Sequence, residues 1–184
     1  MQDQDFLKKC INISKVDSLL QEICKRLFII LPEYKRQKRG AMTSHEAAVY
    51  REIQRNTDMA IKAIHTIADK VSDDALSMQI SRQSLKYSEL HNEASRQLLQ
   101  AKAESYQSSV LSDALLRTGI HYNTMLNTST GHIAEMMIKN STNGILEMEK
   151  VLKHNENAGP KPVALAKQLI EFEEKNVERL KQYL

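Results

Sequence analysis

The sequence predicts an all-helical protein, and three observations lead to that prediction. Only five Gly and three Pro occur among 184 residues, which is too few turn residues for a β-sandwich or a β-barrel. Long stretches place apolar residues three and four positions apart, which is the period of an amphipathic helix. The hydrophobic content of 41% is enough for one core at this length. We therefore expect long helices joined by short connections.

The first two helices of the body are expected to form an antiparallel hairpin. One helix starts at Thr43 or Ser44, and the other starts after a cap at Ser72 or Asp73 and extends to about Glu104. Because only a short turn separates them, they should pack side by side. The apolar stripe of the first helix consists of Val49, Tyr50, Ile53, Ala60, Ile61, Ile64, Ile67, Ala68 and Val71.

The remainder of the body is expected to hold three further helices. A shorter helix covers 107–127, a long helix ends near His154, and a last helix covers 162–183. Residues 128–131 either separate the first two of these helices or only weaken a helix that continues through them. Gly159 is expected as a C-cap, followed by a proline start signal. Together the segments predict an up-down four-helix bundle with an extra helix between its second and third helices.

The chain divides into an N-terminal extension, residues 1–41, and the bundle, residues 42–184. The net charge of +3 comes from the first forty residues, which hold nine Lys and Arg against five Asp and Glu. Two interpretations of the extension stay open. Residues 14–31 form an amphipathic helical appendage that docks on the body, on a partner or on an anionic membrane. Alternatively, translation starts at Met42 and the preceding residues are upstream sequence read in frame.

Composition excludes several classes of partner. The body lacks a basic stripe interleaved with aromatic residues, so we expect no nucleic-acid partner. Cys10 and Cys24 make neither a disulfide framework nor a zinc site, which fits a cytoplasmic protein. No glycine-rich phosphate loop and no nucleophile elbow occur. We expect a homo-oligomer, a dimer, without membrane contact except through residues 14–31.

Acidic residues and histidines on long helices raise the question of a di-metal site. Such a site takes Glu from two helices and Glu-x-x-His from two others, all pointing inward. No Glu-x-x-His occurs, and His132 and Glu135 have this spacing in reverse order. The metal candidates are Glu52, His132, Glu135 and Glu173, and they would hold iron or manganese. A helical projection places Glu52, His132 and Glu135 on the solvent side of their helices. Alternatively, a helix over 107–127 covers the His132–Glu135 pair.

The same projection places six polar residues inside the bundle: Thr57, Gln83, Tyr87, Ser141, Glu173 and Asn176. One carboxylate among them does not suffice for two divalent ions or for paired acid and base catalysis. The six either form a hydrogen-bonded network that fixes helix register, or surround a polar site in which Glu173 has a raised pKa or binds an ion. Ser141 and Gly144 predict a close approach between the third long helix and a neighbour.

Two stretches and one spacing carry a family resemblance. The stretches are Asn127-Thr-Ser-Thr-Gly-His-Ile-Ala-Glu-Met-Met-Ile138 and Glu171-Phe-Glu-Glu-Lys-Asn-Val-Glu-Arg-Leu-Lys181, and the spacing is Gln83-x-x-x-Tyr87. Residues 44–184 resemble uncharacterised bacterial proteins of the ferritin-like superfamily, found especially in Firmicutes. This resemblance implies a ferritin-like four-helix bundle but not iron storage, because the Glu-x-x-His motifs of the superfamily are absent. Spore-coat F proteins share this general fold.

We therefore expect a cytoplasmic ferritin-like bundle without a complete di-iron motif, with a binding or structural role rather than an enzymatic one. A second hypothesis is a metal-dependent iron or manganese oxidase, or a peroxide-handling stress protein. It would use a non-standard site built from Glu52, His132, Glu135 and Glu173. A third hypothesis is a coat-associated or membrane-associated protein that acts through residues 14–31.

Overall fold

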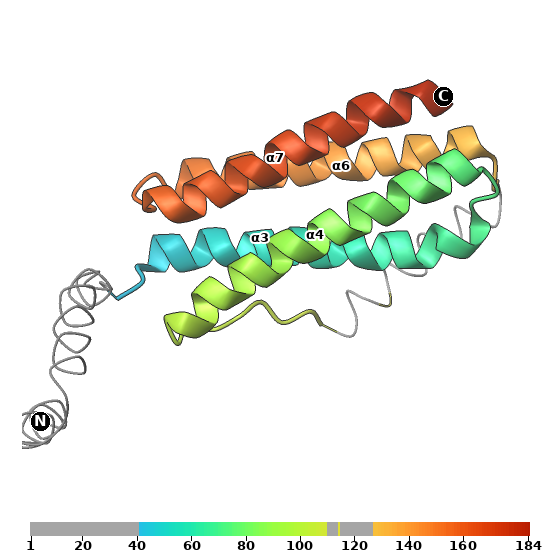
Figure 1. The fold of residues 1–184 in the computed structure, drawn as a ribbon. Coiled ribbons are helices and arrows are strands. Elements are labelled where there is room, and N and C mark those ends of the chain that lie inside the picture. The colour runs from blue at the N-terminus through green and yellow to red at the C-terminus, as the bar shows by residue number, and fades with distance from the viewer. Residues whose placement is uncertain (1–40, 110–113, 115–126) are drawn as a thin grey trace, which may run out of the picture. The chain divides into compact units, whose positions relative to one another are not determined.

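The computed structural model describes residues 41–109, 114 and 127–184, and every regular element in that part of the chain is helical. The long helices are α3 (Ser44–Ile67), α4 (Asp74–Gln100), α6 (Thr130–His154) and α7 (Pro160–Leu180) (Figure 1). Short 3-10 turns follow at Ala68–Lys70 and Lys181–Tyr183. The all-helical prediction is confirmed for these residues. The predicted N-terminal appendage and most of the predicted helix over 107–127 lie outside the described residues.

Side-chain caps set the starts of three helices. Thr43 caps α3 in a capping box, because its side chain accepts from the Glu46 amide while the Glu46 carboxylate accepts from the Thr43 amide. Asp73 caps α4, as one of the two predicted alternatives. Ser129 caps α6, and residues 127–129 are not helical, so α6 is separate from the segment before it.

Gly159 has a different role from the predicted one. Its φ of −64° is not the left-handed conformation of a glycine C-cap, and it serves instead as the N-cap of α7, with Pro160 following in the first turn. A Cβ at this position would lie 2.5 Å from the Glu46 Oε1 atom. Because the capping box of α3 holds this carboxylate, the glycine allows the start of α7 to pack against the start of α3.

The end of α4 also differs from the prediction, because the helix stops at Gln100 rather than near Glu104. Lys102 adopts a left-handed φ of 55°, and its amide donates to the Leu99 carbonyl while the Ala103 amide donates to the Leu98 carbonyl. These two bonds form a Schellman motif. A lysine in the position that glycine usually occupies gives the sequence no stop signal, which explains the four-residue error.

Replacing Lys102 with glycine is expected to raise the free energy of unfolding by about 0.5–1 kcal/mol, because glycine adopts positive φ without a Cβ clash. Urea denaturation followed by circular dichroism measures this change. Lys102→Ala is the matched control, since it removes the same charge but keeps the Cβ, and it should give no gain. Equal effects of the two variants would show that the left-handed backbone is not strained.

The helices form two antiparallel hairpins, α3–α4 and α6–α7 (Figure 1). Two hydrogen bonds between hairpins fix their direction. His45 Nδ1 lies 3.0 Å from Asn155 Oδ1 near one end, and Asn56 Nδ2 donates to the Gly144 carbonyl at 2.9 Å near the middle. Helix α3 is therefore antiparallel to α6, and α4 and α6 run in the same direction. The strict up-down alternation fails at this step, because α4 ends beside the first half of α3 whereas α6 starts beside its end.

One face of each helix builds a shared core. Its largest fully buried apolar side chains are Val49, Ile53, Ile67, Leu76, Ile80, Leu90, Leu98, Ile133, Met148, Leu169 and Leu180. Burying each such side chain contributes about 1.5–3 kcal/mol. Ala68, predicted in the stripe of α3, is exposed in the 3-10 turn instead. No described helix is long and apolar enough to cross a membrane.

Candidate functional site

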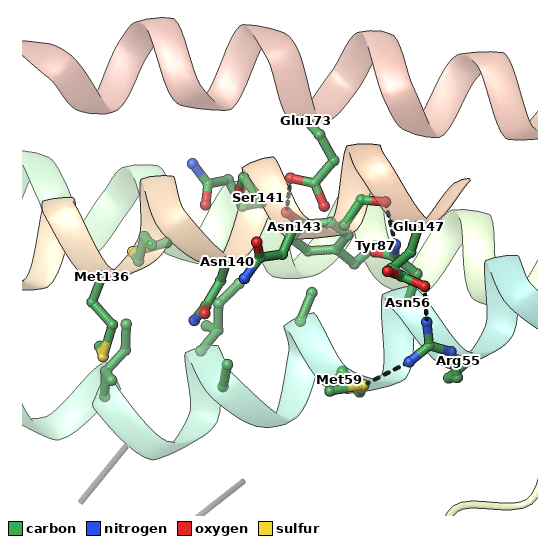
Figure 2. Close-up of a pocket in the computed structure, with 17 residues that line it drawn as sticks. Arg55, Asn56, Met59, Tyr87, Met136, Asn140, Ser141, Asn143, Glu147 and Glu173 are labelled. Atoms are coloured by element: carbon green, nitrogen blue, oxygen red, sulfur yellow. Dashed lines mark hydrogen bonds and ion pairs between the residues drawn. The ribbon is translucent and has the colours of Figure 1, made fainter. Parts of the chain in front are cut away.

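A pocket of about 230 Å³ opens between α3 and α6, the facing helices of the two hairpins (Figure 2). Its walls are largely apolar and come from Met59, Ala60, Ala63, Ile64, Ile67, Met136 and Met137. Thioether side chains are flexible and polarizable, so three methionines in the walls allow them to adapt to the shape of a guest molecule. The site therefore offers an apolar enclosure of the size of a small organic molecule.

Glu173 and Tyr87 form the polar floor of this pocket. Glu173 reaches in from α7, and the Tyr87 hydroxyl of α4 donates to its Oε2 atom at 2.7 Å (Figure 2). Asn176 Nδ2 lies 3.5 Å from the Tyr87 hydroxyl oxygen, at the limit of a weak hydrogen bond. The ring of Phe172 packs edge-on against Tyr87, with centroids 5.1 Å apart. These contacts hold the Glu173 carboxyl group in one place.

Burial controls the protonation of this pair. Glu173 is only 2% exposed, and its burial raises the pKa of the carboxyl group despite hydrogen bonding from Ser141, Tyr87 and Asn176. Burial also raises the pKa of Tyr87 well above 10, and the adjacent Glu173 raises it further. The phenol thus stays protonated and acts as a donor at any physiological pH. No Lys, Arg or His among the described residues forms an ion pair with Glu173.

Two buried amide groups near the floor are incompletely bonded. Gln83 Nε2 and Asn176 Oδ1 have no hydrogen-bond partner in the described part of the chain. Gln83 is 3% exposed and its side chain lines the pocket, although the Nε2 atom itself is covered by protein atoms. Buried polar atoms usually have a hydrogen-bond partner, and an unpaired one lowers the stability of the fold. The polar groups around the floor are therefore not all paired within the described part of the chain.

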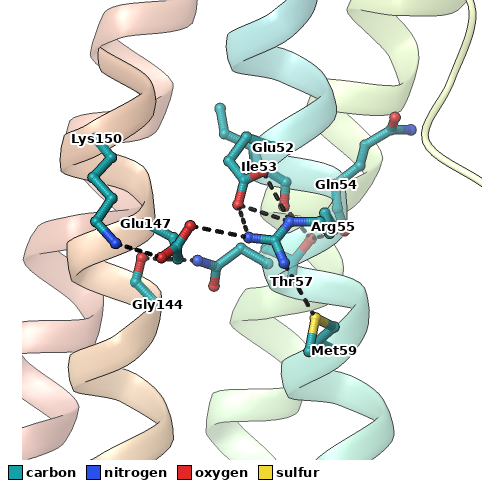
Figure 3. Close-up of polar contacts among 10 residues, drawn as sticks. Glu52, Ile53, Gln54, Arg55, Thr57, Met59, Gly144, Glu147 and Lys150 are labelled. Atoms are coloured by element: carbon teal, nitrogen blue, oxygen red, sulfur yellow. Dashed lines mark hydrogen bonds and ion pairs between the residues drawn. The ribbon is translucent and has the colours of Figure 1, made fainter. Parts of the chain in front are cut away.

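An ion-pair chain borders the pocket mouth (Figure 3). Arg55 Nε donates to Glu52 Oε2 at 2.9 Å, and an Arg55 guanidinium nitrogen lies 3.8 Å from Glu147 Oε2 across the gap to α6. Lys150 donates to Glu147 Oε1 at 2.8 Å and lowers the pKa of that carboxyl group. The hydrogen bond to Glu52 raises the pKa of Arg55. The positive charge of Arg55 is therefore engaged at the rim.

Gly144 fixes how closely α6 approaches α3 at one end of the pocket. A Cβ at Gly144 would lie 3.0 Å from Asn56 Oδ1, and Asn56 Nδ2 donates to the Gly144 carbonyl. The predicted close approach at this glycine is present. Asn56 and Gln54 are buried polar residues that the sequence projection missed. Gln54 bonds Ser95 and the amide of Tyr106, and so ties the segment after α4 to α3.

All six residues predicted to lie inside are buried, and Gln83, Tyr87, Ser141 and Glu173 line the pocket. Asn176 contacts the Tyr87 hydroxyl but does not line the pocket. Thr57 is apart from this group: its hydroxyl donates to the Ile53 carbonyl at 2.7 Å and lies 3.2 Å from His91 Nδ1. The six therefore do not make one continuous network. Instead, four of them belong to the pocket.

The four metal candidates do not come together. Glu135 is exposed, as predicted. Glu52 does not face open solvent, because its side chain is 13% exposed and holds Arg55. For His132 the solvent-facing alternative is wrong, since its Nε2 atom is buried without a described partner. His132 lies about 22 Å along α6 from Glu147, the neighbour of the Glu52–Arg55 pair.

No three His, Cys, Asp or Glu side chains in the described ranges are grouped so that they could share a metal ion. The di-metal hypothesis built on those four residues is therefore not supported by their placement. What the pocket offers chemically is the Glu173 carboxyl group and the Tyr87 phenol at its floor, and the Arg55–Glu147 pair at its rim, around a largely apolar space. These groups are suited to holding and orienting a molecule.

No family model, curated protein or solved structure matches this chain.

Proposed function

We propose that this protein is a binding module that holds one small, largely apolar molecule in the pocket between α3 and α6. The observation that carries the proposal is the combination of apolar walls with a buried, incompletely bonded polar floor. Ligand sites in proteins have this composition, with a few polar groups that fix orientation. The polar floor fixes the orientation of the ligand. Burial of its apolar surface against the walls contributes favourable binding free energy.

The volume of the pocket limits the size of the guest. A cavity of about 150 Å³ accommodates benzene, and drug-sized ligands occupy about 300 Å³ or more. At about 230 Å³ this pocket lies between these limits. A molecule with one ring and a short polar arm is therefore the expected class of ligand.

The ferritin-like four-helix bundle remains our proposal for the fold family. Its support is the chain path: two antiparallel hairpins joined by one long connection between helices that run in the same direction. Ferritin-like bundles have one such crossover. In this proposal the position between the helices, where that superfamily keeps its metal site, is used here for an organic ligand.

A neutral one-ring probe, phenethyl alcohol, is expected to bind the full chain with a dissociation constant in the millimolar to micromolar range. Titration of isotope-labelled protein by NMR should shift the amide signals of the pocket walls on α3 and α6. Ala63→Phe is expected to weaken binding by at least about tenfold, because its ring fills the space next to Ile67.

Ala164→Phe is the matched control, since it places the same ring on an exposed position of α7 that does not line the pocket. It should leave probe binding unchanged. Both variants are checked for folding by thermal denaturation. The proposal fails if the probe does not bind the wild-type chain, or if Ala63→Phe binds it as tightly as Ala164→Phe does.

A further inference from the structure

The Glu173 carboxyl group indicates the chemistry of the ligand. It is 2% exposed, lines the pocket, and accepts from the Tyr87 hydroxyl at 2.7 Å, with further hydrogen bonding from Ser141 and Asn176 but no positively charged partner among the described residues. A carboxylate taken out of water without a positive partner is strongly disfavoured. A bound molecule that supplied the missing positive charge would therefore gain more from this position than a neutral one.

The protein does not supply that charge from the lining of the pocket. Arg55 is the cation among the residues that line it, and its guanidinium is held at the rim by Glu52 and Glu147. Glu147 is paired in turn with Lys150. The rim is thus close to electrical balance, while the floor carries an uncompensated acidic group.

We infer that the pocket recognises a small organic cation, an amine with an apolar body, whose ammonium group binds Glu173. This inference rests on the proposed function and names the substrate class of the same site. The ammonium donates to the carboxylate, and a second N–H is able to reach a lone pair of the Tyr87 hydroxyl oxygen, which uses its own hydrogen toward Glu173.

Gln83 adds a second polar side chain to the lining of the pocket. Its side chain is 3% exposed and lines the same pocket, and its Nε2 donor has no partner among the described residues. An ammonium group does not satisfy a donor. Because the Nε2 atom is covered by protein atoms, a ligand oxygen would reach it only after the Gln83 side chain turns toward the pocket.

The other ligand classes fit the floor less well. A metal ion needs several oxygen or nitrogen ligands, and the described residues offer no group of three acidic, histidine or cysteine side chains around one point. An anion would approach Glu173 without a compensating cation at the floor. A wholly apolar molecule would cover the carboxyl group without supplying a positive charge.

Three probes with the same ring and different polar ends test the inference on the full chain. Phenethylamine is a cation, phenethyl alcohol is neutral and phenylacetate is an anion at about pH 8. We expect the amine to bind at least about tenfold more tightly than the alcohol, and the anion to bind most weakly. NMR titration measures all three dissociation constants. This comparison needs no variant, so it does not depend on whether a substitution folds.

Glu173→Gln should reduce amine binding by at least about tenfold and leave alcohol binding within about twofold. Glu174→Gln, at an exposed position of the same helix, is the control and should change neither. Equal affinity for amine and alcohol, or an amine preference that survives Glu173→Gln, would overturn the inference. The proposed function would still stand if the alcohol binds and Ala63→Phe abolishes that binding, so the two failures are distinguishable.

Discussion

Replacing Tyr87 with phenylalanine is expected to lower the free energy of unfolding by about 1–3 kcal/mol at neutral pH. The substitution removes the hydroxyl that donates to Glu173 Oε2 at 2.7 Å and takes one hydrogen-bond donor from a buried carboxyl group. The ring stays, so its edge-on contact with Phe172 is kept and no large cavity forms. Urea denaturation monitored by circular dichroism measures the change.

Tyr50→Phe is a closely matched control. Tyr50 and Tyr87 are each 3% exposed, but the Tyr50 hydroxyl makes no hydrogen bond with any described residue. Its loss should change the free energy of unfolding by less than about 0.5 kcal/mol. Equal costs for the two substitutions would mean that the Tyr87–Glu173 hydrogen bond does not stabilise the fold.

A double-mutant cycle separates this bond from the general effect of losing a hydroxyl. In a Glu173→Leu background the Tyr87→Phe substitution should cost little, because no carboxyl group is left without a donor. We expect a coupling free energy of about 1 kcal/mol or more between the two positions. Additive costs would contradict a direct interaction between them.

The starts of helices could be predicted from the sequence, because a cap depends on residues that are close together in the chain. Thr43 and Asp73 lie within three residues of the amides that they cap, so the pattern and the structure agree. The end of α4 was not accessible, because Lys102 adopts a conformation that sequence patterns assign to glycine. The direction of α6 was also hidden, since the long connection before it is compatible with either direction.

The interior polar residues were predictable for a different reason. A helical projection gives the angle of each side chain relative to the apolar stripe, and this was enough to place Glu173, Gln83 and Tyr87 inside. The projection does not say which helix a residue faces. It therefore missed that Arg55 covers Glu52 and reaches toward Glu147. The pocket itself depends on how far α3 and α6 separate, which is a property of tertiary packing.

The pH dependence of stability should carry the signature of Glu173. Burial raises the pKa of its carboxyl group above the ordinary value of 4.5, so the folded protein retains a proton that the unfolded chain has released. Stability from this group is fully present below pH 4.5 and is lost as the pH rises through the folded-state pKa. Glutamine keeps an oxygen that accepts from Tyr87 and never ionises.

We therefore expect Glu173→Gln and the wild type to have nearly the same free energy of unfolding near pH 4. Near pH 8 the free energy of unfolding of the variant should be higher by the order of 1 kcal/mol. Denaturation curves at the two pH values measure this difference. Glu174→Gln removes an exposed carboxylate from the next position of α7 and should leave the pH dependence unchanged. A constant difference between Glu173→Gln and the wild type would show that Glu173 does not carry an uncompensated charge. The carboxylate that forms as the pH rises through the folded-state pKa of Glu173 is the group that an amine ligand would neutralise. Phenethylamine should therefore stabilise the wild type more than Glu173→Gln near pH 8.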